Sequence, residues 1–431
     1  MTFETFKTLI LILLVGLSLL LTISLWSYQP DHDRHNTGLK YVNEVELGGD
    51  VASKRSLIKP NAIIFHMNTD YYGFKHPNDM NDLYTLMQDW TMSDPVLEED
   101  ESFPSHDHMV EVIFPENMPM EVVKNIFTLD DPEESLPTWS FQRLLFIFDT
   151  NDSTVKAHFL SVDGREQAIF SVNESNASEK LQTYVNKRTG LVKYLLFEQA
   201  PSRIFLPEDQ VDIRQRTLAV ERIEPSLLVD ALFPNPALVS PNVGEAFFTD
   251  GQRGMNIQQD GNGIEYINPI QSNYEHMGVI NLLDESIQDI NEHKGWTEKY
   301  HLDSIIPSMN QIRYRMHYDS YPIFHQGDLS IIEQQWRNQD LYLYRRPLFR
   351  LTNSFGGSNI KLPSGREVIY YLENNSSYNI ESVRDIRIGF YLTYADDEYY
   401  SVNLEPAWFM DYNGSWQIIR TAETDFNEGG S

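Results

Sequence analysis

Cysteine is absent from all 431 residues of the chain. The protein therefore forms no disulfide bond and offers no thiol for nucleophilic catalysis. Secreted eukaryotic proteins of this size usually contain disulfides, because oxidising compartments favour them. The absence of cysteine fits a protein on the outer face of a bacterium.

Basic residues are also scarce. Lysine and arginine number 33 against 63 aspartates and glutamates, which leaves a formal charge of −30 at pH 7. Such an excess of negative charge opposes binding to nucleic acids and to anionic membrane surfaces. We therefore expect no nucleic-acid partner. The densest acidic run, DPVLEEDES at 94–102, is interpreted as a solvated loop, with cation binding as the alternative.

Signatures of catalysis are missing as well. The sequence contains no G-x-S-x-G elbow, no H-E-x-x-H motif, no P-loop and no S-x-x-K accompanied by its partner motifs. The sequence thus predicts a protein that is not an enzyme and binds no cofactor. A cell-wall hydrolase is an alternative, but it needs two convergent carboxylates and the sequence singles out no pair.

The best candidate for a metal site is the cluster of His106, Asp107 and His108. Imidazole and carboxylate groups are suitable ligands for zinc and copper. These three residues lie in an acidic loop and have no paired second half elsewhere in the sequence. We therefore expect no specific metal site.

A single long hydrophobic run occurs in the chain. Between Leu9 and Trp26 there is no charged residue, and 18 helical residues span roughly 27 Å, close to the hydrocarbon core of a bilayer. A secretory signal has a shorter apolar region, and Trp26 with Tyr28 suits the membrane interface. We predict an uncleaved transmembrane anchor at 9–28, with a cleaved signal as the alternative.

The topology follows from the absence of a second such run. We predict a single-pass protein of the cell membrane, with a cytoplasmic tail at 1–8 and a large extracytoplasmic domain from residue 29. Within the anchor, Ser18 and Thr22 lie four residues apart on one helical face. Such a face permits close approach of another membrane helix and hydrogen bonds to it. The alternative is that both hydroxyls bond to carbonyls of their own helix.

Beyond the anchor, the sequence predicts an α+β fold of antiparallel sheets packed with helices, in three domains. The first domain, 29–200, contains a helix predicted at 78–90 with Asn78 as its N-cap. A strand is predicted to end at Phe114 before a turn at Pro115. The run FQRLLFIFDTNDSTVKAHFLSVDGREQAIFSV then predicts three strands separated by polar turns.

The second half contains an internal repeat. QIRYRMHYDSYPIF from Gln311 and DIRIGFYLTYADDEYY from Asp385 are each followed by a strand containing Trp, an Asn-centred turn and another strand. Each unit follows a predicted helix, at 281–293 and at 364–375, and the second helix begins with a capping box at Ser364. The repeat indicates two similar units.

We therefore predict two similar domains, 201–350 and 351–431, each a helix followed by an antiparallel meander. In this arrangement the helix covers one sheet face and leaves the other available. Tyrosines of these strands could stack on sugars, although cross-strand packing is the alternative. The tyrosines are Tyr314, Tyr318, Tyr321, Tyr342, Tyr344, Tyr391, Tyr394, Tyr399 and Tyr400.

Several runs together resemble the YycH (WalH) family of low-GC Gram-positive bacteria. They are the anchor run FKTLILILLVGLSLLLTISLWSYQP, VEVIFP in the first domain, and YRMHYDSYPIF, DLYLYRRP and LEPAWFMDYNGSW in the second half. The resemblance covers essentially the whole chain in the same order, and no single motif is diagnostic. The C-terminal half is also similar to YycI, which shares the aromatic strand followed by PAW and an Asn-Gly turn.

The resemblance implies a regulatory function. Members of the family are single-pass membrane proteins that associate with YycI and with the sensor histidine kinase WalK (YycG). They adjust kinase activity, positively or negatively according to species, through transmembrane and extracytoplasmic contacts, and the output concerns cell-wall homeostasis. No catalytic residues are carried over. Our hypothesis is a non-enzymatic accessory protein of such a kinase, and the alternative is an extracytoplasmic binding module for an envelope ligand.

Overall fold

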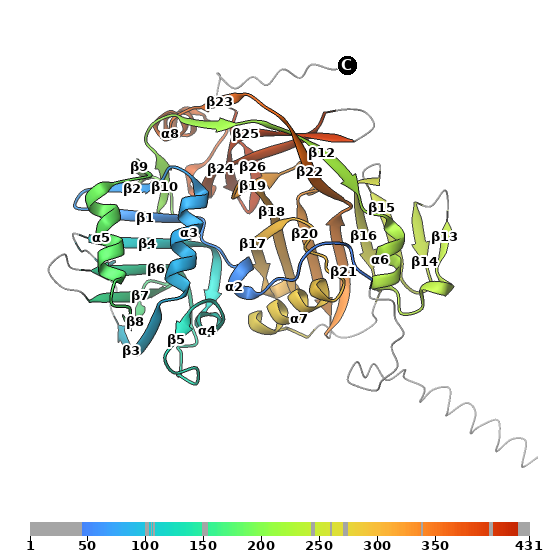
Figure 1. Cartoon of the computed structure of the whole chain (residues 1–431), viewed down its shortest axis with the longest axis horizontal. Coiled ribbons are helices and arrows are strands. Elements are labelled where there is room, and N and C mark those ends of the chain that lie inside the picture. Colours follow the sequence, from blue (N-terminus) through green and yellow to red (C-terminus); the bar gives the residue numbers. More distant parts are fainter. Residues whose placement is uncertain are drawn as a thin grey trace, which may run out of the picture. The chain divides into compact units, whose positions relative to one another are not determined.

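The computed structural model describes residues 45–99, 103–104, 106, 108–148, 154–242, 246–258, 261–269, 275–337, 339–395 and 400–420. Residues from Val45 onward form one compact unit. The predicted anchor at 9–28 lies outside the described residues. Among the described residues, no helix is long and apolar enough to cross a membrane. Two large sheets with flanking helices confirm the predicted α+β class (Figure 1).

The first half of the compact unit builds a ten-stranded sheet in the order β10-β9-β2-β1-β4-β6-β7-β8-β3-β5. Its strands are β1 (Ala62–Met67), β2 (Asp70–Phe74), β3 (Thr91–Glu99), β4 (His108–Pro119), β5 (Thr128–Leu129), β6 (Ser140–Phe148), β7 (Val155–Ser161), β8 (Glu166–Val172), β9 (Leu191–Phe197) and β10 (Ile204–Pro207). Strands β6, β7 and β8 pair antiparallel in sequence order, which confirms the predicted three-stranded meander.

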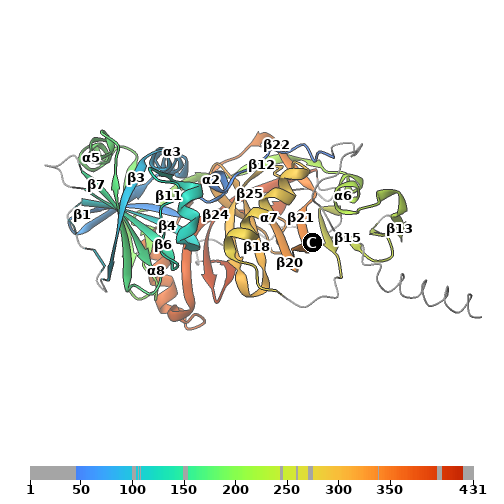
Figure 2. The same cartoon turned by 90° about the horizontal axis from the view of Figure 1, so that it is seen from below.

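Helices pack on one face of this sheet (Figure 1). In Figure 2 the same strands fan out beneath α3 and α5. The ring of Tyr184 in α5 contacts Phe65 and Phe74, and Tyr84 of α3 contacts Phe114. These aromatic contacts hold both helices against β1, β2 and β4. The helices of this half are α2 (Lys54–Leu57), α3 (Pro77–Gln88), α4 (Val123–Ile126), which follows a 3-10 turn at Met120–Val122, and α5 (Ala177–Lys187).

Two local predictions for this half are wrong. Helix α3 begins at Pro77 with His76 in the N-cap position, not at Asn78, because proline has the fixed φ that suits a first helical residue. The chain does not turn at Pro115, because β4 continues through it to Pro119. The pairing of β4 with β6 is irregular between Ile113 and Met118, and such an irregularity tolerates a proline that cannot donate a ladder hydrogen bond.

The second half forms a fourteen-stranded sheet along the path β13-β14-β15-β16-β21-β20-β18-β19-β24-β25-β12-β22, with β17 on β18 and β26 on β25. Its strands are β12 (Arg216–Arg222), β13 (Ser240–Asn242), β14 (Phe247–Thr249), β15 (Gly254–Gln258), β16 (Gly263–Ile267), β17 (Lys299–Ile306), β18 (Gln311–Tyr318), β19 (Tyr321–Phe324), β20 (Ile331–Arg337), β21 (Asp340–Pro347), β22 (Phe349–Gly356), β24 (Val383–Tyr394), β25 (Ser401–Tyr412) and β26 (Ser415–Ile418). A separate ribbon pairs β11 (Val211–Arg214) with β23 (Asn359–Leu362).

The helices predicted before the two repeat units are both present. They are α7 (Val279–Glu292) and α8 (Gly365–Asn374), and α6 (Pro225–Leu232) precedes them. The capping box at Ser364 is confirmed, since its hydroxyl accepts from the Glu367 N–H and its own N–H donates to the Glu367 carboxylate. Helix α7 covers its own meander through the Tyr314 hydroxyl, which donates to Ser286 at 3.1 Å. Helix α8 also lies against β9 and β10 of the first sheet.

The first described residues are bonded to the second half of the fold and not to the first. The N–H groups of Leu47 and Gly49 donate to the carbonyls of His293 and Lys294, at 2.9 and 3.0 Å, just after α7. Arg350 of β22 donates to the Leu47 carbonyl at 2.8 Å. The chain then crosses through α2 to the first sheet (Figure 1). We call residues 45–50 the entry segment.

Candidate functional site: a cavity between the two sheets

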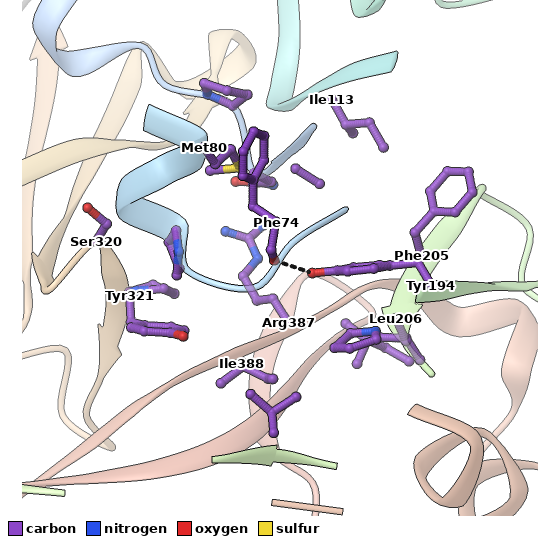
Figure 3. Close-up of a pocket in the computed structure, with 18 of the residues that line it drawn as sticks. Phe74, Met80, Ile113, Tyr194, Phe205, Leu206, Ser320, Tyr321, Arg387 and Ile388 are labelled. Carbon is purple, nitrogen blue, oxygen red and sulfur yellow. Dashed lines mark hydrogen bonds between the residues drawn. The ribbon is translucent and has the colours of Figure 1, made fainter. Parts of the chain in front are cut away.

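A cavity of about 380 Å³ lies where the two sheets meet. Its walls come from both halves of the chain, and Figure 3 shows labelled side chains from both around it, such as Phe74, Tyr194, Tyr321 and Ile388. Small-molecule sites are mostly apolar concavities of roughly 300–1,000 Å³ with a few placed polar groups. The cavity is therefore the principal candidate site in the described part of the chain.

The cavity exists because two strand edges face each other without pairing. Strand β10 is the last strand of the ten-stranded sheet. Strand β24 pairs with β25 along its whole length, whereas its other edge pairs with β19 only at Phe390 and Tyr391. The two edges lie beside each other, and the Ser202 hydroxyl donates to the Arg384 carbonyl at 2.7 Å. Residues 385–388 of β24 line the cavity.

Apolar side chains form much of the wall. The Tyr194 hydroxyl donates to the Phe74 carbonyl at 3.3 Å (Figure 3), which fixes the ring against the first sheet. A Cβ at Gly73 would lie 2.6 Å from that ring, so only glycine fits at this position. Trp408 donates its indole N–H to the Pro363 carbonyl at 2.9 Å. The polar atoms of both rings are thus bonded to backbone.

Two lining carboxylates are paired with arginines. Asp303 of β17 accepts two hydrogen bonds from Arg315, at 2.7 and 2.9 Å, and both side chains are about 95% buried. Burial would raise the pKa of Asp303, but the charge and hydrogen bonds of Arg315 outweigh it and hold the pKa below its usual value. Asp385 accepts from Arg387 at 2.6 Å. Neither carboxylate is left with an uncompensated charge.

Two lining cations lack such a partner. The Lys59 ammonium donates to the Gln88 amide oxygen at 3.3 Å and lies 5.2 Å from the centre of the Tyr84 ring. Burial, together with the charge of Arg55, lowers the pKa of Lys59 to about 8. The Arg203 guanidinium stacks 4.4 Å from the centre of the Phe103 ring. Among the described residues, neither cation forms an ion pair with a carboxylate.

A histidine pair stands beside Lys59. The rings of His301 on β17 and His317 on β18 have their centres 4.1 Å apart. His317 donates from Nδ1 to the Arg315 carbonyl at 2.9 Å. Burial lowers the pKa of His317 to about 3 and holds the pKa of His301 well below its usual value, with the neighbouring positive charges acting in the same direction. Both rings are neutral at pH 7.

The structure does not assemble the other candidates from the sequence. His106 is exposed and Asp107 lies outside the described residues. Across the described ranges, no group of three or more His, Asp or Glu side chains could hold a metal ion. The Ser18 and Thr22 pair falls outside the described residues as well.

The tyrosines do not form one surface. Tyr314 and Tyr344 are completely buried in the core of the second sheet, and only Tyr321 of the nine lines the cavity among those described. Cross-strand packing therefore accounts for Tyr314 and Tyr344. Sequence reasoning missed the cavity, because its residues come from segments as far apart as Lys59 and Trp408 and no local motif joins them.

Comparisons with known proteins agree with the sequence resemblance. The chain matches the family model described as YycH protein, N-terminal domain, over residues 4–190, and the model described as YycH protein, C-terminal domain, over residues 201–425. A curated relative, the two-component system WalR/WalK regulatory protein YycH of Bacillus subtilis (strain 168), is 22% identical over 438 residues, 95% of each chain. The crystal structure of YycH from Bacillus subtilis matches with a TM-score of 0.73 at 18% identity, covering 86% of this chain and 99% of that one.

Proposed function

The chain belongs to the YycH family, and from this premise we propose that it is a non-enzymatic accessory protein of a cell-wall-regulating sensor histidine kinase. It modulates a kinase of the WalK (YycG) type through transmembrane and extracytoplasmic contacts, together with a YycI-like partner. The similarity to a WalR/WalK regulatory protein along 95% of both chains supports this proposal.

The proposal includes the membrane topology and the domain arrangement. The anchor occupies residues 9–28, the tail at 1–8 is cytoplasmic, and three extracytoplasmic domains follow at 29–200, 201–350 and 351–431. The charge-free run of the anchor supports the topology. The succession of helix and antiparallel meander, seen at α7 and again at α8, supports the similarity of the last two domains.

The observation that carries the proposal is the attachment of the entry segment. Three N–H groups, those of Leu47, Gly49 and Asp50, donate to backbone carbonyls of residues 293–296. This segment follows the predicted anchor in sequence, and the residues it binds come directly after helix α7, which packs on the second sheet. On this proposal, the second half of the fold is the part that responds first to the anchor, because the entry segment binds there.

Co-purification from native membranes tests the proposed association. Full-length tagged protein is compared in mild detergent with a variant in which an unrelated membrane helix replaces Leu9 to Trp26. We expect a histidine kinase to accompany the first protein and to be lost with the second. Retention of the kinase by the variant would assign recognition to the extracytoplasmic part, and absence of a kinase from both would contradict the proposed function.

The anchor face is tested separately by changing Ser18 and Thr22 together to leucine. We expect weaker kinase association, because the face loses its small and hydroxylated residues. Ser24→Leu is the matched control, since it removes a hydroxyl from the other side of the same helix. If the double variant and the control co-purify equal amounts of kinase, the face that carries Ser18 and Thr22 is not the one that contacts the kinase.

The entry segment is tested by Gly49→Ala. A Cβ at this position would lie 2.4 Å from the carbonyl oxygen of Trp296, so the segment must detach or shift. We expect the kinase to co-purify as before and its autophosphorylation to respond less to the accessory protein. Gly278→Ala is the control, because a Cβ there meets nothing within 4 Å.

A second candidate function is the binding of an envelope ligand. The cavity between β10 and β24 favours it, because both halves of the fold contribute apolar walls. The first half also contributes two cations, Lys59 and Arg203, that pair with no carboxylate among the described residues. This function is compatible with kinase regulation, since an occupant would contact both sheets at once.

A further inference from the structure

We propose that the cavity binds a small amphiphile with an anionic head group, whose carboxylate or phosphate lies against Lys59 and His301 and whose apolar part lies along Tyr321 and Ile388. This inference rests on the binding function proposed above and specifies the class of ligand. It does not depend on which kinase the protein regulates.

The first argument is the state of Lys59. Its side chain is partly buried, yet its polar partners among the described residues are one amide oxygen and the face of one aromatic ring. A buried cation without an anion is unfavourable, because it loses hydration without gaining a compensating charge. In a chain with a formal charge of −30, carboxylates are plentiful, and none of those in the described part of the chain pairs with this ammonium. A bound anion would supply the missing charge.

The second argument concerns the carboxylates that do line the cavity. Asp303 and Asp385 are held by the guanidinium groups of Arg315 and Arg387. Asp209 and Asp212 are exposed at the rim. The inner wall near Lys59 therefore presents no uncompensated negative charge that would repel an anionic head group.

The third argument is the position of His301. Its ring makes no hydrogen bond to any described residue, although His301 lines the cavity and its ring lies against that of His317. A neutral imidazole has one N–H donor and one acceptor nitrogen. An anion placed beside both His301 and Lys59 would accept a hydrogen bond from each. The ring of His317 supports this position, because its Nδ1 is already committed to the Arg315 carbonyl.

The apolar part of the ligand follows from the remaining wall. Rings and aliphatic groups surround the cavity, among them those of Phe74, Met80, Tyr321 and Ile388 (Figure 3). Trp408 lines it as well. Burial of apolar surface against them stabilises a bound chain by about 25 cal/mol per Å². The volume of about 380 Å³ is near the lower end of the range for small-molecule sites. This volume favours a ligand whose apolar part is a single short hydrocarbon chain.

Calorimetric titration of the full-length protein in lipid nanodiscs tests the inference, with empty nanodiscs as the blank. The probes are octanoate, octyl phosphate and uncharged octanol. We expect at least one of the two anions to bind about tenfold or more tightly than octanol, because charge-assisted hydrogen bonds to the head group are lost in the alcohol. The stronger of the two anions identifies the head group. If neither anion binds more tightly than octanol, the inference is overturned.

Variants locate the site. Lys59→Met should weaken binding of the anion about tenfold or more and leave octanol unchanged, whereas Lys156→Met, which removes an exposed lysine of β7 away from the cavity, should change neither. Ile388→Trp fills the cavity from β24 and should abolish binding of anion and alcohol alike, which provides a test even if Lys59→Met does not fold. Unchanged anion binding in a folded Lys59→Met or Ile388→Trp variant would contradict the inference.

The two proposals fail in different experiments. Loss of kinase co-purification would leave the titration unaffected, because no kinase is present in the nanodiscs. Absence of anion binding would leave the co-purification result standing. A negative result in one experiment therefore contradicts one proposal and leaves the other unaffected.

Discussion

Ile323 of β19 lies opposite Phe390 of β24 in a parallel pair, and this short ladder joins the two antiparallel parts of the larger sheet. Strand β19 is delivered to this position by a tight turn from β18, in which Asp319 and Ser320 both have positive φ, 48° and 64°. Two successive residues of this conformation form the turn that matches the twist of a hairpin. The junction also defines where the free edge of β24 begins, and hence one side of the cavity.

Gly389→Ala should weaken this junction. A Cβ at residue 389 would lie 2.6 Å from the Pro322 carbonyl oxygen and 2.6 Å from the Phe324 ring. Backbone cannot move aside as a flexible side chain can, so we expect a loss of about 2–3 kcal/mol in the free energy of unfolding. Urea denaturation measures it. Gly278→Ala should change stability by only about 0.5 kcal/mol, and an equal effect of the two substitutions would show that β19 does not constrain Gly389.

Glu298→Gln should stabilise the protein at pH 8. Burial raises the pKa of Glu298 to about 7, although its carboxylate accepts from the Leu351 N–H at 2.6 Å and Arg350 is near. The folded pKa exceeds the unfolded value of 4.5, so the folded state binds more protons and stability is lost as pH rises from 4.5 to 7. Glutamine keeps the acceptor without the charge. We expect the free energy of unfolding, measured by urea denaturation, to rise by about 1–3 kcal/mol at pH 8 and to change little at pH 4. An equal rise at both pH values would contradict this account.

Acidification should destabilise the protein through its buried histidines. Burial, reinforced by Arg346, lowers the pKa of His293 to about 3, well below its ordinary value of 6.5. The unfolded state therefore binds more protons, and stability falls as pH drops from 6.5 toward 3. His293→Gln should make the free energy of unfolding depend less steeply on pH, by up to about 1.4 kcal/mol per pH unit. The control, His76→Gln, changes an exposed histidine, and its urea midpoints between pH 7 and pH 5 should follow those of the parent.

Glu111→Leu should destabilise the first sheet severely. Glu111 is completely buried on β4, accepts from His66 Nε2 at 2.7 Å and is paired with Arg143 of β6. Burial would raise the pKa of Glu111, but the His66 hydrogen bond and the Arg143 charge outweigh it and lower the pKa. Removing the carboxylate leaves Arg143 without its charge partner, and we expect a loss of about 3–5 kcal/mol.

A double-mutant cycle separates the loss of the pair from the loss of volume. If Arg143→Leu is added to Glu111→Leu, the uncompensated charge disappears and much of the stability should return. Simple additivity of the two single losses in urea denaturation would mean that the charges do not interact.

The sequence predicted best those features that depend on neighbouring residues. The capping box of Ser364 and Glu367 places both partners within one helical turn, and the structure contains it. The three strands β6, β7 and β8 follow one another through short polar turns, so their pairing requires little loop closure. The turn expected at Pro115 was wrong, because the ladder partners on both sides of β4 decide whether the strand continues.

The amino-acid order by itself determined the α+β class, the helices before each meander and the excess of negative charge, because periodicity, capping and composition are properties of short segments. The tertiary structure alone decided that the edges of β10 and β24 lie beside each other without pairing, and that Lys59 and His301 line the same cavity. These contacts join residues more than a hundred positions apart. Local propensities carry no information on them, since they arise only when two separately formed sheets pack and desolvate their common boundary.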